Sequence, residues 1–317
     1  MVKTQEIAGP RLKKKSKWKQ FVHWLPFYIM ALPGLAYLLI NNYIPLLGLQ
    51  IAFKNFSYSK GMWDSKWIGL KNFRFLFKTS DAWIMIRNTL FYNIAWIILG
   101  IILGVAAAIL INEVIGKLKK KFYMTAILLP YLMSAVIIAY LVYAYLSPSA
   151  GMFTKWLENT LGSAPQFYQE KAWWPFILTF VSQWKSIGFG MILYLSSVLG
   201  IDQSLYEAAT LDGASRWQQH RMITIPLLKP TIIMMFILNL GQIFRSDFGL
   251  FYQVPMNQGA LFSVTQTIDT YVYRALLKLN DVGMSSAASF VQSVVGFVFI
   301  VTANKIISRF DKNSSLF

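Results

Sequence analysis

The sequence predicts an all-α integral membrane protein with six transmembrane helices, and three observations support this fold class. Hydrophobic residues make up 56% of the 317 residues and charged residues only 14%, whereas a soluble domain carries about 25% charged residues. The mean hydropathy is +0.47. Six stretches reach the length of about 20 mostly apolar residues that a membrane-crossing helix needs. Within lipid such stretches must be helical, because every backbone polar group needs a partner inside the segment.

The six predicted spans lie within residues 22–53, 89–112, 122–146, 173–201, 222–244 and 282–304. Pro26 and Pro33 fall in the first span, so we expect it to be kinked or followed by a short break. The second span carries no charge and contains GIILG at 100–104, whose small residues predict close packing against another helix. The fourth and fifth spans carry one charged residue each, Lys185 and Lys229.

An even number of spans places both termini on the same side of the membrane. Lys and Arg are concentrated on the cytoplasmic side of membrane proteins, near the ends of the spans. The densest clusters here are RLKKKSKWK at 11–19 and KLKKK at 117–121, which favours cytoplasmic termini although the first outer loop is also basic. The expected organisation is a cytoplasmic tail at 1–21, a six-span domain at 22–307 and a second cytoplasmic tail at 308–317.

The residue types argue against several classes of function. The chain has no Cys, only two His, and 13 dispersed Asp and Glu, so neither a thiolate metal site nor a paired-carboxylate active site is expected. No GxxxxGK[ST] phosphate loop occurs. Basic residues beside the spans explain the net charge of +17, so we expect no nucleic-acid partner. None of the acids lies in the middle of a span, which argues against an ion-coupled transporter.

The polar loop at 199–221, between the fourth and fifth spans, contains EAATLDGASRW at 207–217 and is followed by MITIPLLKP. Its spacing is EAA, three residues, Gly, nine residues, Ile, one residue and Ile-Pro. This pattern resembles the EAA loop in permease subunits of binding-protein-dependent type I ABC importers, with Ile225 where the family has Leu. GLKNFRFLF at 69–77 and LLPYLMSA at 128–135 extend the resemblance to maltose-type carbohydrate permeases, in particular their polysaccharide or oligosaccharide branch.

The resemblance implies that this loop couples the permease to an ATPase. Ser204 can cap a first short helix, and Gly213 can end that helix or turn the chain, so we expect a cytoplasmic helix–turn–helix knob. In the family this knob docks in a cleft of the ATP-binding subunit. The positions carried over are Glu207, Ala208, Ala209, Asp212 and Gly213. The alternative is a connector of capped amphipathic helices without a docking role.

The resemblance further implies a transport subunit that is not an enzyme. It predicts an ATP-driven importer of oligosaccharides in the bacterial plasma (cell inner) membrane, in which this multi-pass chain alternates between outward- and inward-facing states. The expected partners are a second permease subunit, two ATP-binding subunits that hold ATP and Mg, and an extracytoplasmic solute-binding protein. This chain is expected to hold no cofactor and no metal. Two alternatives are a permease of this kind for a non-sugar solute and a membrane anchor that transports nothing.

The resemblance also places a substrate cavity among the third, fourth and fifth spans. Sugar sites combine a few hydrogen-bonding groups with apolar and aromatic walls. The positions carried over are Tyr131, Ser134, Ala135, Ser182, Lys185, Ser186, Asn239 and Gln242. For Ser182, Ser186 and Asn239 a hydrogen bond between helices is an equally simple interpretation, because Ser and Asn often make such bonds within membranes.

Lys185 is the charged residue among these positions. A cation that faces the cavity, with Arg245 and Arg274 toward the outer side, would suit an acidic sugar such as a uronate oligosaccharide. A Lys near the end of a span can instead extend its ammonium group to the membrane surface. The sequence leaves both interpretations open.

Overall fold

The structure is a computed structural model that describes residues 17–74 and 80–310. Most of the two predicted tails, 1–21 and 308–317, lies outside the described residues. The chain divides into two compact units, Met1–Gln50 and Ile51–Phe317.

The first unit consists, in its described part, of one long helical stretch. Helix α1 (Lys17–Leu38) contains Pro26 and Pro33, and a π-helical turn follows at Leu39–Tyr43. A 3-10 helix at Ile44–Phe53 then leads into the second unit. Proline removes one backbone donor from a helix and crowds the preceding turn. The helix type changes after Leu38, but Phe21–Phe53 is one helical stretch, so the kink or short break expected in the first span remains a prediction.

Five helical stretches of the described chain are long and apolar enough to cross a membrane. They are Phe21–Phe53, Asp81–Glu113, Lys171–Leu199, Arg216–Leu240 and Val282–Arg309. A bent pair of helices, Lys117–Leu132 with Ala135–Leu146, is long and apolar enough for a sixth span when its two members are taken together. Strand structure in the described residues is confined to the antiparallel hairpin of β1 (Lys54–Ser57) and β2 (Ser65–Trp67), which pairs Lys54 with Trp67. The all-α fold class is therefore confirmed.

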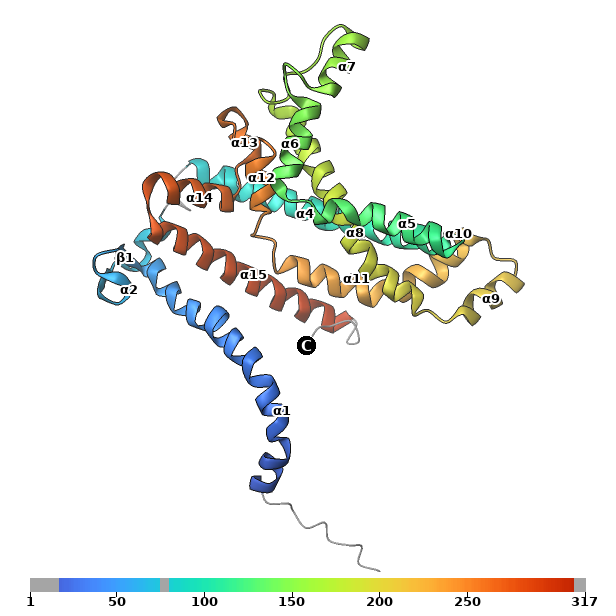
Figure 1. Cartoon of the computed structure of the whole chain (residues 1–317), viewed down its shortest axis with the longest axis horizontal. Helices are drawn as coiled ribbons and strands as arrows, with labels where there is room; N and C mark the ends of the chain where they lie inside the picture. The colour runs from blue at the N-terminus through green and yellow to red at the C-terminus, as the bar shows by residue number, and fades with distance from the viewer. Residues whose placement is uncertain (1–16, 75–79, 311–317) are drawn as a thin grey trace, which may run out of the picture. The chain divides into compact units, whose positions relative to one another are not determined.

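The helices of the second unit are coloured along the chain in Figure 1. Their bounds are α2 (Gly61–Asp64), α4 (Ser80–Glu113), α5 (Lys117–Leu128), α6 (Ala135–Leu146), α7 (Met152–Leu161), α8 (Trp174–Leu199), α9 (Gln203–Leu211), α10 (Arg216–Gln219), α11 (Ile225–Leu240), α12 (Phe248–Gln253), α13 (Phe262–Thr265), α14 (Ile268–Leu279) and α15 (Val282–Phe310). The fifth span therefore ends as a helix at Leu240, four residues before its predicted end, and residues 241–244 form a turn.

The third predicted span, 122–146, is not one continuous helix, which corrects the expectation. Helix α5 ends at Leu128, a 3-10 turn that contains Pro130 follows, and α6 leaves at 98° to the first segment (Figure 1). Met133 has an extended backbone, and the Ser134 hydroxyl accepts a hydrogen bond from the Ile137 backbone N–H at 3.3 Å. A proline followed by a capping serine thus ends one helix and starts another.

Helix α4 packs along α8, and small residues on α4 make the approach possible. A Cβ atom on Gly104 would lie 3.0 Å from the ring of Tyr194, and one on Gly100 would lie 3.5 Å from the side-chain oxygen of Gln183. Ala108 and Met191 are fully buried in the core beneath this contact. The close packing predicted from GIILG is therefore confirmed.

Helix α5 reaches α8 at a second close contact. A Cβ atom added to Gly188 of α8 would overlap the carbonyl oxygen of Ile127, so only a glycine fits there without a shift of backbone. Helix α11, which forms most of the fifth span, packs on α15, α8 and α4.

Candidate functional site

The loop between α8 and α11 forms two short helices, α9 and α10. Asp202, and not the predicted Ser204, is the N-cap of α9, because its carboxylate accepts a hydrogen bond from the Ser204 backbone N–H at 3.0 Å. That hydrogen bond lowers the pKa of Asp202 below its ordinary value. The prediction of a short capped helix was correct, and the capping residue lies two positions earlier than expected.

Gly213 ends α9 in the manner predicted for it. Its φ of +79° is a left-handed conformation that glycine adopts without steric cost. The Ala214 N–H donates to the Ala209 carbonyl at 2.9 Å, and the Gly213 N–H donates to the Thr210 carbonyl at 3.1 Å. These two bonds form a Schellman motif, which satisfies carbonyl groups left free at a helix end.

Helix α10 is fixed against α9 by polar side chains. Ser215 and Gln218 form a capping box at its start, which satisfies two free backbone donors. The buried Gln219 amide donates to the Thr210 hydroxyl at 3.0 Å and to the Ala214 carbonyl at 3.1 Å. The two short helices therefore form one structured knob.

The outer surface of this knob is open to a partner. Glu207, Ala208 and Asp212 are exposed, while Ala209 is half-buried. Two large apolar side chains stand out nearby, Leu211 at 90% exposed and Trp217 at 69% exposed. Exposed apolar groups amid polar ones are typical of a protein–protein contact surface.

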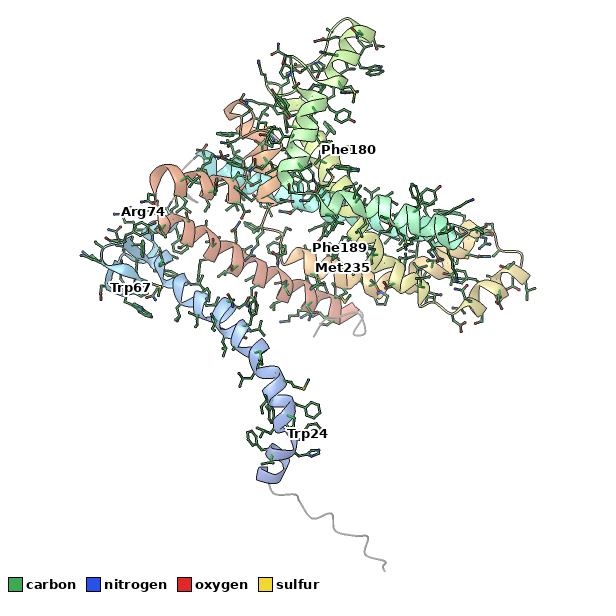
Figure 2. The ribbon with its side chains drawn as sticks, in the orientation of Figure 1. Trp24, Trp67, Arg74, Phe180, Phe189 and Met235 are labelled. Atoms are coloured by element: carbon green, nitrogen blue, oxygen red, sulfur yellow. The ribbon has the colours of Figure 1, made fainter. Side chains whose placement is uncertain are left out.

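A cavity of about 300 Å³ lies between α4, α8 and α11. Its lining includes Ser182, Ser186, Asn239 and Gln242, which are half of the predicted substrate positions. The remaining lining residues are Asn93, Trp96, Ile97, Gly100, Ile101, Gln183, Ile187, Phe189, Gly190, Tyr194 and Met235. Figure 2 labels Phe189 and Met235, which come from α8 and α11. The cavity thus combines amide and hydroxyl groups with aromatic walls.

Within this cavity the polar groups differ in how far they are already hydrogen-bonded. The Ser186 hydroxyl donates to the Ser182 carbonyl at 2.7 Å, a bond within α8. The side-chain amides of Asn239 and Gln242 are exposed and make no hydrogen bond to any described residue. These two amides are therefore free to bind a ligand.

The other four predicted positions do not line the cavity. Tyr131 stacks on the cavity residue Phe189, with ring centroids 4.9 Å apart and planes at 11°. Ser134 caps α6, and the Ala135 methyl group lies against Gly249 at the start of α12. Lys185 pairs with Asp247, its Nζ atom 3.2 Å from Oδ2. The structure thus brings together the predicted positions of the fourth and fifth spans except Lys185, and those of the third span do not line the cavity.

Among the cavity residues that reasoning from the sequence missed are Asn93, Trp96 and Gln183. Asn93 and Trp96 lie on α4, in a span that was not expected to reach the site. Gln183 of α8 is 7% exposed, and its side-chain oxygen has no hydrogen-bond partner among the described residues. The sequence could have indicated Gln183 as a site residue, because it lies between Ser182 and Trp184 within a span. A polar side chain within a membrane faces a cavity or a neighbouring helix.

Arg274 does not extend a cationic site toward the cavity. Its guanidinium donates to Asn257 at 3.1 Å and to Gln266 at 2.9 Å, and it lies over the ring of Phe262 at 4.1 Å. Burial lowers the pKa of Arg274 below its ordinary value. Its guanidinium therefore makes hydrogen bonds within the segment between α11 and α15.

Comparison with known proteins agrees with this architecture. Residues 97–312 match the family described as "Binding-protein-dependent transport system inner membrane component". The chain is 32% identical to Protein LplB of Bacillus subtilis (strain 168) over 94% of this chain and 91% of that protein. It is 31% identical to the polygalacturonan/rhamnogalacturonan transport system permease protein YteP of the same organism over 98% of both chains.

A solved structure shows the same fold. A chain of a bacterial ABC transporter "involved in the import of the acidic polysaccharide alginate" superposes with a TM-score of 0.83 and 32% sequence identity, over 93% of this chain and 99% of that one. A second structure of that transporter, with an alginate pentasaccharide-bound periplasmic protein, matches equally well.

Apolar spans, a cavity between them lined by polar and aromatic side chains, and a structured loop at one end define a membrane permease subunit. The chain belongs to the family of inner membrane components of binding-protein-dependent transport systems. It is accordingly a transport subunit and not an enzyme.

Proposed function

We propose that this chain is a permease subunit of an ATP-driven importer of oligosaccharides. The cavity between α4, α8 and α11 carries the proposal, because it joins the free amides of Asn239 and Gln242 to the aromatic side chains of Trp96 and Phe189. Sugars are bound by such combinations of hydrogen-bonding groups and apolar walls. The similarity to permeases named for polysaccharide fragments supports the same class of substrate.

Within this class we favour acidic, uronate-containing oligosaccharides. Lys185 lies on α8 one residue before Ser186 and three after Ser182, so it is next to the face of the helix that lines the cavity. Its side chain is 21% exposed and is paired with Asp247, whose side chain is 41% exposed. A substrate carboxylate would exchange with Asp247 as the partner of Lys185. The relatives named for polygalacturonan and for alginate support an acidic substrate.

Uptake by the reconstituted transporter tests this assignment. Lys185→Met should reduce the uptake of a uronate oligosaccharide by about tenfold and that of a neutral oligosaccharide of equal length far less, because a charge-assisted hydrogen bond contributes about 1.5–3 kcal/mol. Asp247→Asn is the matched control, since it removes the competing carboxylate and should leave uronate uptake intact or raise it. An equal loss of both sugars in Lys185→Met would overturn the acidic substrate.

We further propose that the knob formed by α9 and α10 docks on an ATP-binding subunit. Glu207, Ala208, Ala209, Asp212 and Gly213 would contribute the contact, with exposed Leu211 and Trp217 beside them. ATP and Mg would be bound by that partner. The conformational change driven by ATP hydrolysis would then be transmitted to this chain through the knob. The assembly would contain a second permease subunit, two ATP-binding subunits and an extracytoplasmic binding protein.

This assignment places both termini and the knob on the cytoplasmic side of the bacterial inner membrane. The Lys-rich start of α5 would then face the cytoplasm, as the distribution of basic residues in membrane proteins favours. Cysteine labelling tests the orientation cleanly, because the chain has no Cys of its own. A single Cys at exposed Leu211 should react with an impermeant maleimide only after the cytoplasmic face is opened, whereas one at Trp156 of α7 should react in intact cells.

A further inference from the structure

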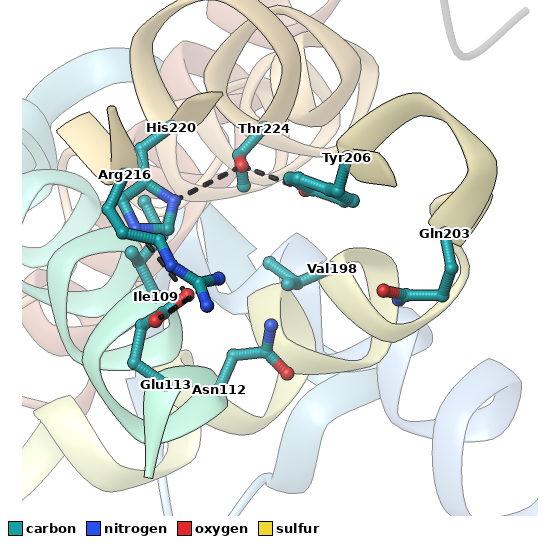
Figure 3. A pocket seen from close by; sticks show the side chains of 9 residues that line it. All are labelled: Ile109, Asn112, Glu113, Val198, Gln203, Tyr206, Arg216, His220 and Thr224. Carbon is teal, nitrogen blue, oxygen red and sulfur yellow. Dashed lines mark hydrogen bonds and ion pairs between the residues drawn. The ribbon is translucent and has the colours of Figure 1, made fainter. Parts of the chain in front are cut away.

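Glu113, the last residue of α4, contacts the second half of the loop between α8 and α11. Its Oε2 atom lies 3.7 Å from a terminal nitrogen of Arg216, the first residue of α10. Its Oε1 atom lies 3.6 Å from Nε2 of His220, the residue that follows α10. Figure 3 shows these side chains around a polar cavity of about 60 Å³. One carboxylate at the end of the second span therefore faces two residues of the knob.

The contact continues from His220 to the start of α11 and to α9. The other imidazole nitrogen, Nδ1, lies 3.4 Å from the Thr224 hydroxyl, and that hydroxyl lies 2.8 Å from the Tyr206 hydroxyl. Tyr206 belongs to α9 and Thr224 immediately precedes α11. We call this series, Tyr206–Thr224–His220–Glu113, the polar chain (Figure 3).

One arrangement of protons satisfies every member of the polar chain. The Tyr206 hydroxyl donates to Thr224, the Thr224 hydroxyl donates to Nδ1 of His220, and Nε2–H is then directed at Glu113. The Glu113 carboxylate at the end lies 3.6 Å from Nε2, which is an electrostatic contact and is longer than a hydrogen bond. A glutamine at position 113 would keep the shape of the side chain and lose the negative charge that orients this series.

The two contacts of Glu113 differ in how exposed the partner side chain is. Thr224 is 1% exposed and the His220 side chain 14% exposed, whereas the Arg216 side chain is 77% exposed. Exposed ion pairs contribute little because water and salt screen them. The Glu113 side chain is 37% exposed in both contacts, so the contact with the less exposed His220 is screened less by water and is the stronger link between α4 and the knob.

The backbone gives a second reason to single out this place. His220–Thr224 is a π-helical turn between α10 and α11, and such turns occur frequently at functional sites. It places His220 and Thr224 on the side that faces Glu113 and Tyr206. The charged and titratable groups that meet His220 are Glu113 of α4, Arg216 of α10 and, through Thr224, Tyr206 of α9.

We infer that Glu113 is a positioning residue that links the knob to α4 through His220. The inference rests on the proposed docking of the knob on an ATP-binding subunit. Movement of the knob is passed to α11 by direct continuity of the chain, and the polar chain passes it to α4 as well. Since α4 and α11 both line the cavity, the two walls then move together when the knob moves.

The test is the number of sugar molecules imported per ATP hydrolysed by the complete transporter in proteoliposomes. Glu113→Gln should lower this ratio by about fivefold or more, the lower end of the usual range of coupling between sites, while the ATP-binding subunits still co-purify. Glu158→Gln is the matched control, because it makes the same change on α7 at an exposed position outside the knob. It should leave the ratio unchanged.

A double variant separates positioning from general damage. If Glu113 acts through His220, Glu113→Gln combined with His220→Phe should be no worse than either single variant, because both break the same series. Additive losses would overturn the inference, and so would an unchanged ratio in Glu113→Gln. A wild-type transporter that imports no oligosaccharide, or that does not retain its ATP-binding subunits, would instead overturn the proposed function.

Discussion

Lys185 in the fourth span and Asp247 at the start of α12 form an ion pair across 62 residues of sequence, with 3.2 Å between Nζ and Oδ2. Asp247 also caps α12, because its other carboxylate oxygen accepts a hydrogen bond from the Leu250 N–H at 3.0 Å. One side chain therefore links the segment between α11 and α15 to the fourth span and starts a helix in that segment.

The two roles of Asp247 can be separated by substitution. Asp247→Asn keeps a good capping residue and loses only the ion pair, whereas Asp247→Ala loses both. We expect Asp247→Ala to lower the free energy of unfolding by about 1 kcal/mol more than Asp247→Asn, the usual contribution of an N-cap. Thermal unfolding of the purified transporter measures the difference, and equal shifts for the two variants would contradict the capping role.

A second prediction concerns Gly213, whose left-handed backbone conformation is required where α9 ends. Gly213→Val should strain the turn by about 1–2 kcal/mol and misplace the knob, so that the ATP-binding subunits are lost on co-purification or hydrolyse ATP without import. Gly213→Asn is the control, since Asn tolerates this conformation better than a branched residue. Full ATP-dependent uptake by Gly213→Val would show that the turn is not needed for docking.

Glu207 tests the docking surface without changing the turn. It is exposed on α9, so a bulky replacement such as Glu207→Trp should leave the spans folded and weaken the contact with the ATP-binding subunit. We expect co-purification to fall by about tenfold, the size of effect seen when a central interface position is altered by more than about 1 kcal/mol. Retention of the ATP-binding subunits with normal uptake would remove Glu207 from the interface.

The contact between α5 and α8 makes a prediction about stability alone. Gly188→Ala places a methyl group against the Ile127 carbonyl and should destabilise the protein by about 1–3 kcal/mol, as overpacking does. Gly190→Ala is the matched control two residues away, because no other atom lies within 4 Å of the added Cβ. Thermal unfolding should show a lower midpoint for Gly188→Ala only, and similar midpoints would mean that α5 can move away from α8 at little cost.

Asn239 tests the sugar cavity directly. Its free side-chain amide should hydrogen-bond a sugar hydroxyl, so Asn239→Ala should raise the sugar concentration for half-maximal uptake by about fivefold, the effect of losing a hydrogen bond of about 1 kcal/mol. Asn159→Ala on the exposed α7 is the control. Unchanged uptake by Asn239→Ala at low sugar concentration would remove this residue from the site.

Local patterns predicted the spans, the packing of GIILG and the turn at Gly213, because each depends on residues close together in sequence. The break in the third span was not predicted, although Pro130 was visible, since membrane helices often continue through a proline. The break between α5 and α6 depends on the combination of Pro130 with the cap at Ser134. A single proline carries less information than that pair.

The cavity was predicted on α8 and α11, and its wall on α4 was not. Ser182 and Ser186 lie four residues apart and share a helical face, so one sequence segment suffices to group them. Asn93 and Trp96 join them only because α4 packs along α8. The pairing of Lys185 with Asp247 likewise depends on tertiary structure, which single-sequence periodicity does not contain.

The break between α5 and α6 limits how far each of these helices reaches across the membrane. Each of these helices has 12 residues, a length of about 18 Å at 1.5 Å per residue, against a hydrocarbon core of about 30 Å. The neighbouring α4, with 34 residues, is about 51 Å long. Neither α5 nor α6 alone therefore reaches across the hydrocarbon core, whereas α4 is long enough to extend beyond it.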